Sequence, residues 1–302
     1  MTVMDKKRAG FTFEGIGTKW CILTDGAPLS EDARISVLAH VGSFNERFSR
    51  FLFSSETCAF RNAAAGTYPV SDEFAKLLSR ADELRRLTGG RYDPAVGGLL
   101  EEAGYDAAHS MTPRQGTAQF VLPAWSLMGR ELTIDGPVVF DIGGIGKGYC
   151  IDRVAGILEQ YGHRHYLVDG GGDMYGTKKR GGEAWHVALE YPGKSDTAAG
   201  VVELEDQGIA VSDSFRRRWD TWHHIVDPLL RTPIERVVGA VAVAKNAWTA
   251  DCVTSALFLS DEEQRPAIAR SFPSEFLVFR GDETARVSPN WSGELFLSRS
   301  TS

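Results

Sequence analysis

The sequence predicts an α+β protein in which mixed antiparallel sheets pack against helices. Strand-like runs outnumber helical ones and do not alternate regularly with them, which favours segregated strands and helices over a doubly wound parallel sheet. The chain contains no internal repeat and no long low-complexity linker. We therefore expect a single domain over residues 1–302, with residues 1–10 as a disordered N-terminus.

Three segments show the apolar spacing of helices. The first covers residues 74–87, follows Ser71 as an N-cap and stops at a pair of glycines. The second starts near Gly146 and ends before Gly162, and the third covers residues 249–259. Strands are expected where β-branched and aromatic residues form short runs. These runs are residues 20–24, 138–140, 166–169, 185–190, 208–211, 237–244, 276–279 and 294–297.

The composition excludes several classes of protein. Of the 302 residues, 43% are hydrophobic and 24% are charged, so the chain can bury a core and remain folded in water. A formal net charge of −7 argues against a nucleic-acid binder, and no apolar run approaches the ~18 residues that cross a bilayer. The basic N-terminus leads into no apolar segment, so we expect a cytoplasmic protein without direct membrane insertion.

The four cysteines give no sign of a disulfide framework or a zinc site. They stand far apart in the sequence and form no CxxC pair, which indicates reduced thiols. They are Cys21, Cys58, Cys150 and Cys252.

The densest motif is DIGGIGKGY at residues 141–149, where a strand-like run meets a helix. Glycines let backbone N–H groups approach a ligand, and a helix N-terminus beside Lys147 attracts an anion. The motif matches neither the Walker loop nor the GxGxxG dinucleotide loop. It is typical of a phosphate site of another kind, although a tight turn would use the same glycines. The run DGGGD at residues 169–173 is a weaker signal, since a strand-exit turn explains it nearly as well.

The third predicted helix carries oxygen atoms on one face. Asp251, Thr254 and Ser255 stand at i, i+3 and i+4, so they project together, opposite an apolar stripe. Mg²⁺ takes hard oxygen ligands and fills its other positions with water and substrate phosphates. The face could bind magnesium, or it could be an ordinary polar surface in contact with water.

Titratable and basic residues gather at residues 216–228. His224 and Asp227 lie in the run HHIVDP, and a histidine beside a carboxylate can act as a base near neutral pH. Most such histidines are structural or simply exposed. Residues 216–218 are all arginine and could hold phosphate or form a cationic surface strand. Spacing alone does not choose between these interpretations.

Taken together and in this order, the segments resemble the ApbE family of FAD:protein FMN transferases. The family motifs include LTGGxFDPTVG, DLGGIAKGYAVD, VNLGGD, HIIDP and TADALAT. The matching segments are IGT at 16–18, FSRF at 48–51, SE at 55–56, LTGG at 87–90, YDPAVG at 92–97, DIGGIGKGYCID at 141–152, VDGGGD at 168–173, HIVDP at 224–228, TAD at 249–251 and TS at 254–255. No single segment is specific, but the ordered set is.

The resemblance implies a T-fold-like ApbE architecture and a Mg²⁺-dependent transfer of FMN from FAD to a Ser or Thr hydroxyl of an acceptor protein, with release of AMP. It places Phe51 near the isoalloxazine ring. It implies that FAD is contacted by Ile16, Phe51, Ala95, Val96, Gly97, Asp141, Lys147 and Ile225. It implies that Mg²⁺ is held by the Gly144 carbonyl together with Asp251, Thr254 and Ser255. We further hypothesise that His224 or Asp227 helps to deprotonate the acceptor hydroxyl.

Some positions depart from the family pattern. Thr254 stands where some relatives carry a second carboxylate, and the family's Arg-Thr-Gly after HIIDP is displaced into residues 229–233. Two alternatives therefore stay open: an FAD pyrophosphatase that uses water at the same site, and a non-catalytic FAD-binding protein. For a transferase, we expect the acceptor to be a flavoprotein or flavoprotein domain in the cytosol.

Overall fold

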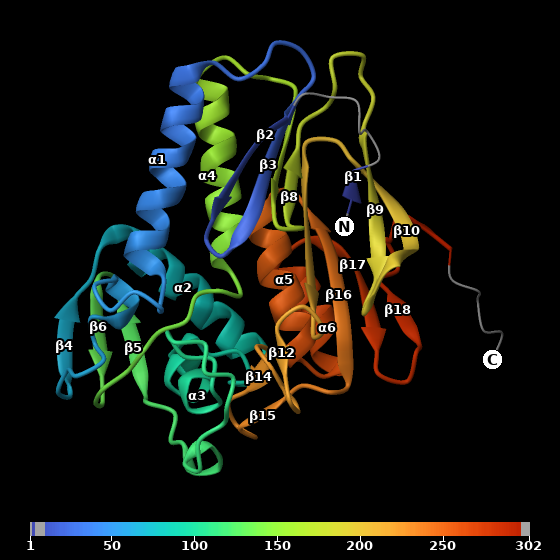
Figure 1. The fold of residues 1–302 in the computed structure, drawn as a ribbon. Coiled ribbons are helices and arrows are strands. Elements are labelled where there is room, and N and C mark those ends of the chain that lie inside the picture. Colours follow the sequence, from blue (N-terminus) through green and yellow to red (C-terminus); the bar gives the residue numbers. More distant parts are fainter. Residues whose placement is uncertain (1, 4–9, 297–302) are drawn as a thin grey trace.

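The computed structural model of the chain describes residues 2–3 and 10–296. Residues 1 and 4–9 of the expected disordered N-terminus therefore lie outside the described residues, while Thr2–Val3 forms the short strand β1. The last residue of the strand expected at 294–297 also lies outside them. The α+β class is confirmed, with antiparallel sheets and packed helices (Figure 1).

An eight-stranded sheet forms the centre of the fold, in the order β18-β17-β16-β11-β8-β7-β3-β2. All its neighbouring strands are antiparallel. Its strands are β2 Gly10–Gly15, β3 Thr18–Thr24, β7 Tyr166–Gly170, β8 Met174–Gly176, β11 Gln207–Asp213, β16 Val237–Ala244, β17 Ser274–Arg280 and β18 Ala285–Val287. Strands β3, β7, β11, β16 and β17 occur where the sequence predicts them, whereas the central strand β8 was not predicted.

Two smaller sheets and two short hairpins complete the β structure. One sheet has the order β1-β9-β10-β19, and the other has the order β4-β6-β5. Their further strands are β9 Trp185–Tyr191, β10 Lys194–Leu204, β19 Glu294–Leu295, β4 Gly66–Pro69, β5 Trp125–Met128 and β6 Glu131–Ile134. The hairpins pair β12 Arg218–Trp219 with β13 Trp222–His223, and β14 Val226–Asp227 with β15 Thr232–Pro233.

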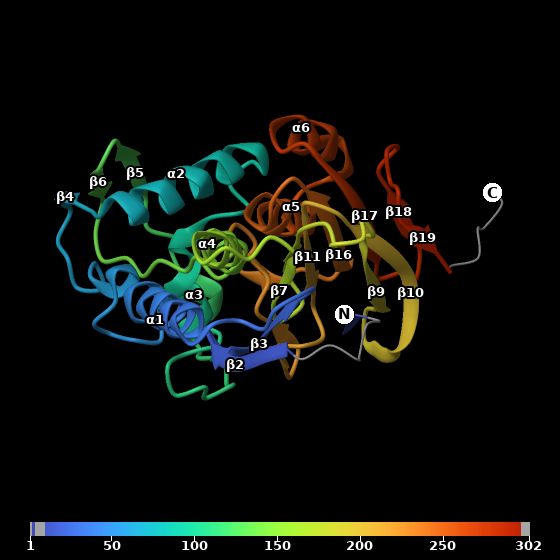
Figure 2. The same cartoon turned by 90° about the horizontal axis from the view of Figure 1, so that it is seen from above.

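Six α-helices lie within the described residues. They are α1 Glu31–Phe48, α2 Asp72–Leu87, α3 Gly97–Glu102, α4 Gly146–Gln160, α5 Ala247–Leu259 and α6 Arg265–Ser271. The three predicted helices are confirmed as α2, α4 and α5, and the Ser71 side chain caps α2 by accepting from the Phe74 N–H. Seen from above, helices lie on one side of the large sheet and β9–β10 on the other (Figure 2).

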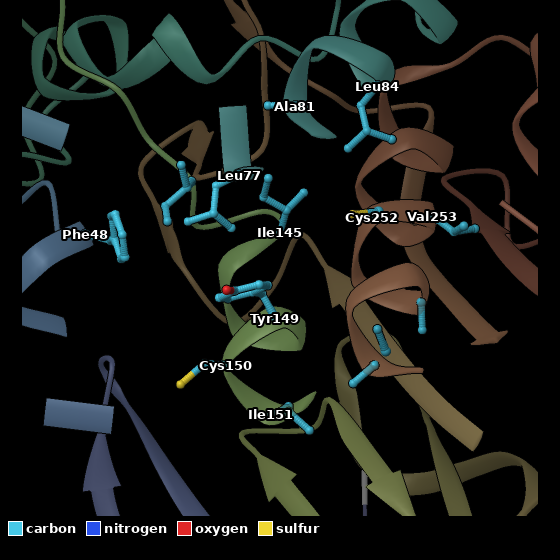
Figure 3. Close-up of a cluster of buried hydrophobic side chains, with 14 of the residues drawn as sticks. Phe48, Leu77, Ala81, Leu84, Ile145, Tyr149, Cys150, Ile151, Cys252 and Val253 are labelled. Carbon is cyan, nitrogen blue, oxygen red and sulfur yellow. The ribbon is translucent and has the colours of Figure 1, made fainter. Parts of the chain in front are cut away.

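The large sheet is buried on both faces because its strands alternate between two cores. Along β16, Ala240, Ala242 and Ala244 join the core on the helical side, while Val241 and Val243 join the core shared with β9 and β10. The small alanine side chains allow α5 to pack closely on this strand. Figure 3 shows the helical core, where Leu77 of α2, Ile145 and Tyr149 near the start of α4, and Cys252 of α5 gather.

The start of α5 is fixed to α4 by a carboxylate. Asp152 of α4 accepts hydrogen bonds from the N–H groups of Ala247 and Trp248, at 2.9 and 3.0 Å. The Asn246 side chain caps the same helix by accepting from the Thr249 N–H. This arrangement places the predicted oxygen-bearing face of α5 against the glycine-rich start of α4.

One expected strand is absent, one open alternative is excluded and one helix was missed. Residues 138–140 form no strand, because their N–H groups bond to loop carbonyls, as from Val138 to Phe60 and from Phe140 to Thr57. Helix α5 has no solvated polar face, since Asp251 is 3% exposed and lies inside the protein. The 18-residue helix α1 was not predicted, although its buried residues have helical spacing: Ala33, Val37, Val41, Phe44 and Phe48.

None of the helices in residues 2–3 and 10–296 combines the length and apolar character needed to cross a membrane. All four cysteines are unpaired; three are buried, and Cys21 is half-buried.

Candidate active site

A cavity of about 780 Å³ opens where the end of α1, the start of α4, the end of β11 and helix α5 meet. This size suits a large organic ligand. Ten of the residues proposed from the sequence line it: Ile16, Phe51, Val96, Asp141, Gly144, Lys147, His224, Ile225, Asp251 and Ser255. Four do not line it: Ala95, Gly97, Asp227 and Thr254.

The turn between β2 and β3 forms one wall of the cavity. Ile16 and Gly17 both adopt positive φ, at 51° and 66°. A β-branched residue rarely takes this conformation, and it costs of the order of 1–3 kcal/mol. The turn therefore holds the Ile16 side chain against the cavity at an energetic cost, as is common at ligand sites.

The segment that enters α4 is held by side-chain contacts. Asp141 Oδ1 accepts from the Gly143 N–H at 2.6 Å, and Asp141 Oδ2 accepts from Arg50 Nε at 2.6 Å. Gly148 lies so close to α5 that a Cβ atom there would fall 2.3 Å from the Ala247 carbonyl oxygen. Only glycine fits at this position, which explains one glycine of the motif by packing rather than by ligand contact.

Lys147 lies between two carboxylates. Its ammonium group donates to Asp173 Oδ2 in a short ion pair, and Asp173 Oδ1 accepts from the Val211 N–H at 3.1 Å. Burial lowers the pKa of Lys147, but the negative charges of Asp173 and Asp251 outweigh it and raise that pKa overall. Lys147 is thus a charged residue of the cavity wall, and its cation is already paired within the protein.

Asp251 is the buried carboxylate of α5. Its Oδ2 accepts from the Gly148 N–H at 2.9 Å, and no hydrogen-bond partner of its Oδ1 is recorded among the described residues. Burial and the nearby charge of Asp173 raise the pKa of Asp251 well above its ordinary value. A cation bound beside this carboxylate would stabilise its charged form and so oppose both causes of the raised pKa.

Two further oxygen atoms lie beside Asp251. The Ser255 hydroxyl donates to the Gly144 carbonyl at 2.5 Å, so these two atoms meet at the same edge of the cavity. The Thr254 hydroxyl instead donates to the Asp251 carbonyl and accepts from Ser212 Oγ at 3.0 Å. The structure therefore brings Gly144, Asp251 and Ser255 together and turns Thr254 away from the cavity.

Of the two residues expected to act as a base, only His224 lines the cavity. Burial, together with the positive charge of Arg217, lowers the pKa of His224 to about 3, so its imidazole is neutral near pH 7. The Asp227 carboxylate is 1% exposed and accepts from the N–H groups of Leu229 and Leu230. Asp227 therefore stabilises the turn between β14 and β15, and it does not line the cavity.

The arginines at residues 216–218 differ from one another. Arg216 pairs with Glu190 and Asp213, at 3.0 and 3.1 Å. Arg217 lines the cavity and is half-buried, and no hydrogen bond or ion pair of its side chain is recorded among the described residues. The sequence left open a phosphate contact or a cationic surface strand. The half-buried Arg217 fits the phosphate contact, whereas Arg216, which also lines the cavity, is already paired with two carboxylates.

Phe51 belongs to an aromatic cluster at the cavity. Its ring stacks on His109 with centroids 5.1 Å apart and meets Tyr105 edge to face at 5.2 Å. Beneath these rings the Arg50 guanidinium lies 4.3 Å from the Phe51 centroid and 4.8 Å from the Tyr105 centroid. A planar ring system could stack on such a surface.

The segment 95–97 presents only its middle residue to the cavity. Ala95 is fully buried, and its N–H donates to Asp93 Oδ1 at 2.8 Å. The Gly97 N–H donates to the Val139 carbonyl, and a Cβ atom on Gly97 would lie 2.5 Å from that oxygen. Of these three residues only Val96 lines the cavity, while Ala95 and Gly97 are packed against neighbouring segments.

Several cavity residues were not predicted from the sequence. Arg50 stood inside a recognised segment, but nothing in the segment indicated that it pairs with a residue 91 positions away. Tyr92, which lines the cavity, and Asp173, which does not line it but pairs with Lys147, also stood in recognised segments without an assigned role. A charged or hydroxyl-bearing residue within an otherwise apolar or glycine-rich motif could have indicated these positions, because such a group needs a partner when it is buried.

The fold and the cavity define an α+β protein with a large cavity lined by glycine, charged and aromatic residues. The family model of the ApbE family matches residues 16–278, and the chain belongs to this family. The family expected from the sequence motifs is thereby confirmed.

Curated relatives carry the name FAD:protein FMN transferase. The protein of Rhodobacter capsulatus is 27% identical over 277 residues, which cover 85% of this chain and 52% of the relative. The protein of Haemophilus influenzae is 27% identical over 286 residues, which cover 86% of this chain and 82% of the relative. This chain thus spans about half the length of the first relative and most of the second.

Solved structures share the fold. The ApbE protein of Thermotoga maritima matches with a TM-score of 0.81 at 21% identity, covering 94% of this chain and 97% of that one. The flavin transferase ApbE of Vibrio cholerae matches with a TM-score of 0.77 at 24% identity, over the same shares of the two chains. These matches confirm the ApbE architecture.

Proposed function

We propose that this chain transfers FMN from FAD to a Ser or Thr hydroxyl of an acceptor protein, with Mg²⁺ as the metal and AMP as the second product. The observation that carries the proposal is the meeting of Asp251, Ser255 and the Gly144 carbonyl at the start of α4, inside one cavity. Relatives named FAD:protein FMN transferase support the same reaction.

The residues present fit a magnesium ion. The Asp251 carboxylate, the Gly144 carbonyl and the Ser255 hydroxyl are hard oxygen donors, and Mg²⁺ needs few protein ligands when a substrate supplies phosphates. No cluster of three or more His, Cys, Asp or Glu occurs among the described residues, so a site richer in carboxylates is absent there. When bound, the metal would neutralise negative charge that develops on the pyrophosphate.

The proposed reaction exchanges one phosphorus–oxygen bond for another. The acceptor hydroxyl oxygen bonds to the phosphorus of the FMN half, and the bond from that phosphorus to the bridging oxygen breaks. AMP leaves with the electron pair of the broken bond. The hydroxyl proton must be taken up, and the neutral imidazole of His224 is our candidate because it lines the cavity.

The remaining cavity residues suit the dinucleotide. Arg217 offers a cation to the phosphates, and the aromatic group of Phe51, Tyr105 and His109 offers a surface for a planar ring. Ile16 and Ile225 supply apolar contacts. The acceptor in this proposal is a flavoprotein, or a flavoprotein domain, that presents its hydroxyl at the cavity.

One assay separates the proposal from its alternatives. The protein is incubated with FAD, Mg²⁺ and a candidate acceptor, and the acceptor is examined for in-gel flavin fluorescence while AMP is measured. A fluorescent adduct formed together with AMP is the expected result. AMP without an adduct on any tested flavoprotein domain would favour hydrolysis, and bound but intact FAD would favour storage.

A further inference from the structure

The hydroxyl of Tyr92 has no hydrogen-bond partner among the described residues, although the side chain is only 6% exposed. Its backbone is firmly held, because the Tyr92 N–H donates to Thr88 Oγ1 at 2.9 Å. The next residue is fixed as well, since Asp93 Oδ1 accepts from Trp125 Nε1 at 2.8 Å. A fixed, buried and unpartnered hydroxyl is rare in a folded protein and calls for an explanation.

The ring of Tyr92 stands at the oxygen-rich edge of the cavity. A Cβ atom placed on Gly144 would lie 3.4 Å from Tyr92 Cε2 and 2.8 Å from Ser255 Oγ. The tyrosine thus borders the same glycine as the proposed magnesium ligands. Burial, followed by the charges of nearby acids that include Asp141 and Asp251, raises the pKa of Tyr92. Because an ordinary tyrosine is already protonated near neutral pH, the hydroxyl is available as a donor.

Several oxygen atoms at this edge of the cavity already accept hydrogen bonds within the protein. Both oxygens of Asp141 accept hydrogen bonds, from Gly143 and from Arg50. The Gly144 carbonyl accepts from Ser255, and Asp251 accepts from Gly148. None of these oxygens, nor the second oxygen of Asp251, bonds to the Tyr92 hydroxyl. The hydroxyl can therefore donate to an oxygen that arrives with a ligand, and phosphate oxygens are strong acceptors for such a group.

We propose that Tyr92 is a positioning residue whose hydroxyl donates a hydrogen bond to a pyrophosphate oxygen of the bound dinucleotide. The inference rests on the proposed function, because it takes FAD as the ligand. The ApbE resemblance implied FAD contacts for residues 95–97 and gave Tyr92 no role. The proposal therefore adds a phosphate contact from the same segment.

The Tyr92→Phe variant tests the inference, because it removes the hydroxyl and keeps the ring. The family block LTGGxFDPTVG carries Phe at this place, so the variant is expected to fold. We would measure thermal unfolding without ligand, and the affinities for FAD, ADP and riboflavin in the presence of Mg²⁺. Tyr161→Phe, which removes an exposed hydroxyl bonded to Ser36, is the matched control.

We expect two effects of opposite sign. The ligand-free variant should unfold at the same or a higher temperature, because an unpaired buried hydroxyl is removed. Its Kd for FAD and for ADP should rise about tenfold, whereas its Kd for riboflavin, which has no phosphate, should stay within twofold. A merely structural tyrosine would not weaken phosphate ligands while leaving the free protein as stable.

Three results would overturn the inference: Kd values for FAD and ADP within twofold of wild type, an equal weakening of riboflavin, or weaker binding of Mg²⁺ alone. The last result would assign the hydroxyl to the metal. Failure of the proposed function looks different. A wild-type protein that binds neither FAD nor ADP would contradict FAD as the ligand, before any variant is compared.

Discussion

Arg50 and Asp141 form an ion pair in the wall of the cavity, with Arg50 Nε donating to Asp141 Oδ2 at 2.6 Å. Arg50 is 3% exposed, and neither of its terminal nitrogens donates a hydrogen bond among the described residues, although Nη1 lies 3.9 Å from Glu101 Oε1. The pair connects the end of α1 to the glycine-rich entry of α4. Asp141, which the family resemblance assigned to FAD, thus also fixes the shape of the site.

Replacing Arg50 should destabilise the protein. Arg50→Met leaves the Asp141 carboxylate without its cation, and we expect a loss of about 1.5–3 kcal/mol in the free energy of unfolding, measured with urea. Adding Asp141→Asn to this variant should cost less than the sum of the two single changes, because the unpaired charge is gone. Strictly additive losses would contradict a coupled pair.

Asp251 contributes to stability as well as to the proposed metal site. Asp251→Ala should lower the free energy of unfolding by about 1–3 kcal/mol, because the buried Gly148 N–H loses its acceptor. Asp251→Asn keeps a carbonyl acceptor and removes a charge that repels Asp173, so it should be more stable than the alanine variant.

Both Asp251 variants should lose Mg²⁺-dependent release of AMP from FAD, which a magnesium titration would measure. Thr254→Val is the matched control on the same helix, because Thr254 faces away from the cavity. We expect that variant to keep its dependence on magnesium. If Asp251→Ala were as stable as wild type, the result would contradict a structural role for this carboxylate and would favour the solvated polar face that the sequence left open.

Arg217 should bind phosphate without supporting the fold. Because its side chain lines the cavity and no partner of it is recorded among the described residues, Arg217→Gln should weaken FAD binding about tenfold and leave the unfolding temperature unchanged. The difference in FAD affinity between wild type and Arg217→Gln should become smaller at high salt, because ions screen the charge of the arginine. Arg286→Gln, outside the cavity, is the control. Equal FAD affinities for the two variants would show that Arg217 makes no such contact.

The sequence predicted those helices and strands best that have one apolar, buried face and one polar, exposed face. Helix α2 was predicted together with its N-cap, because it has one buried and one exposed side. Helix α5 was located, but the sequence left open whether its polar face meets water or a buried site. It is buried on all sides, so the polar residues Asp251 and Thr254 do not indicate solvent there. Spacing shows which residues share a face and not what covers that face.

The candidate site was predicted at the level of motifs rather than of contacts. The resemblance implied that Asp141, Gly144 and Asp251 belong to one site. In the structure the same three residues line one cavity. Their partners come from distant segments, as with Arg50 on Asp141. A single sequence shows no such pairing, because hydrogen bonds between loops leave no periodic pattern.

His224 should make the stability of the protein sensitive to acid. Its pKa in the folded protein is about 3, below the ordinary value of 6.5. Above pH 6.5 the imidazole is neutral in both states, and its stabilising effect is fully present. As the pH falls below 6.5, the unfolded chain takes up a proton that the folded protein refuses. The free energy of unfolding then falls by up to about 1.4 kcal/mol per pH unit.

His224→Gln should remove this dependence, so its free energy of unfolding should fall less steeply than that of wild type between pH 6.5 and about pH 4. Urea unfolding at a series of pH values would measure the difference. His186→Gln, which changes an exposed histidine, should follow the wild-type curve. Parallel curves for His224→Gln and wild type would show that the imidazole takes up its proton equally in both states. Separately, an undiminished rate of flavin transfer in His224→Ala would exclude His224 as the base.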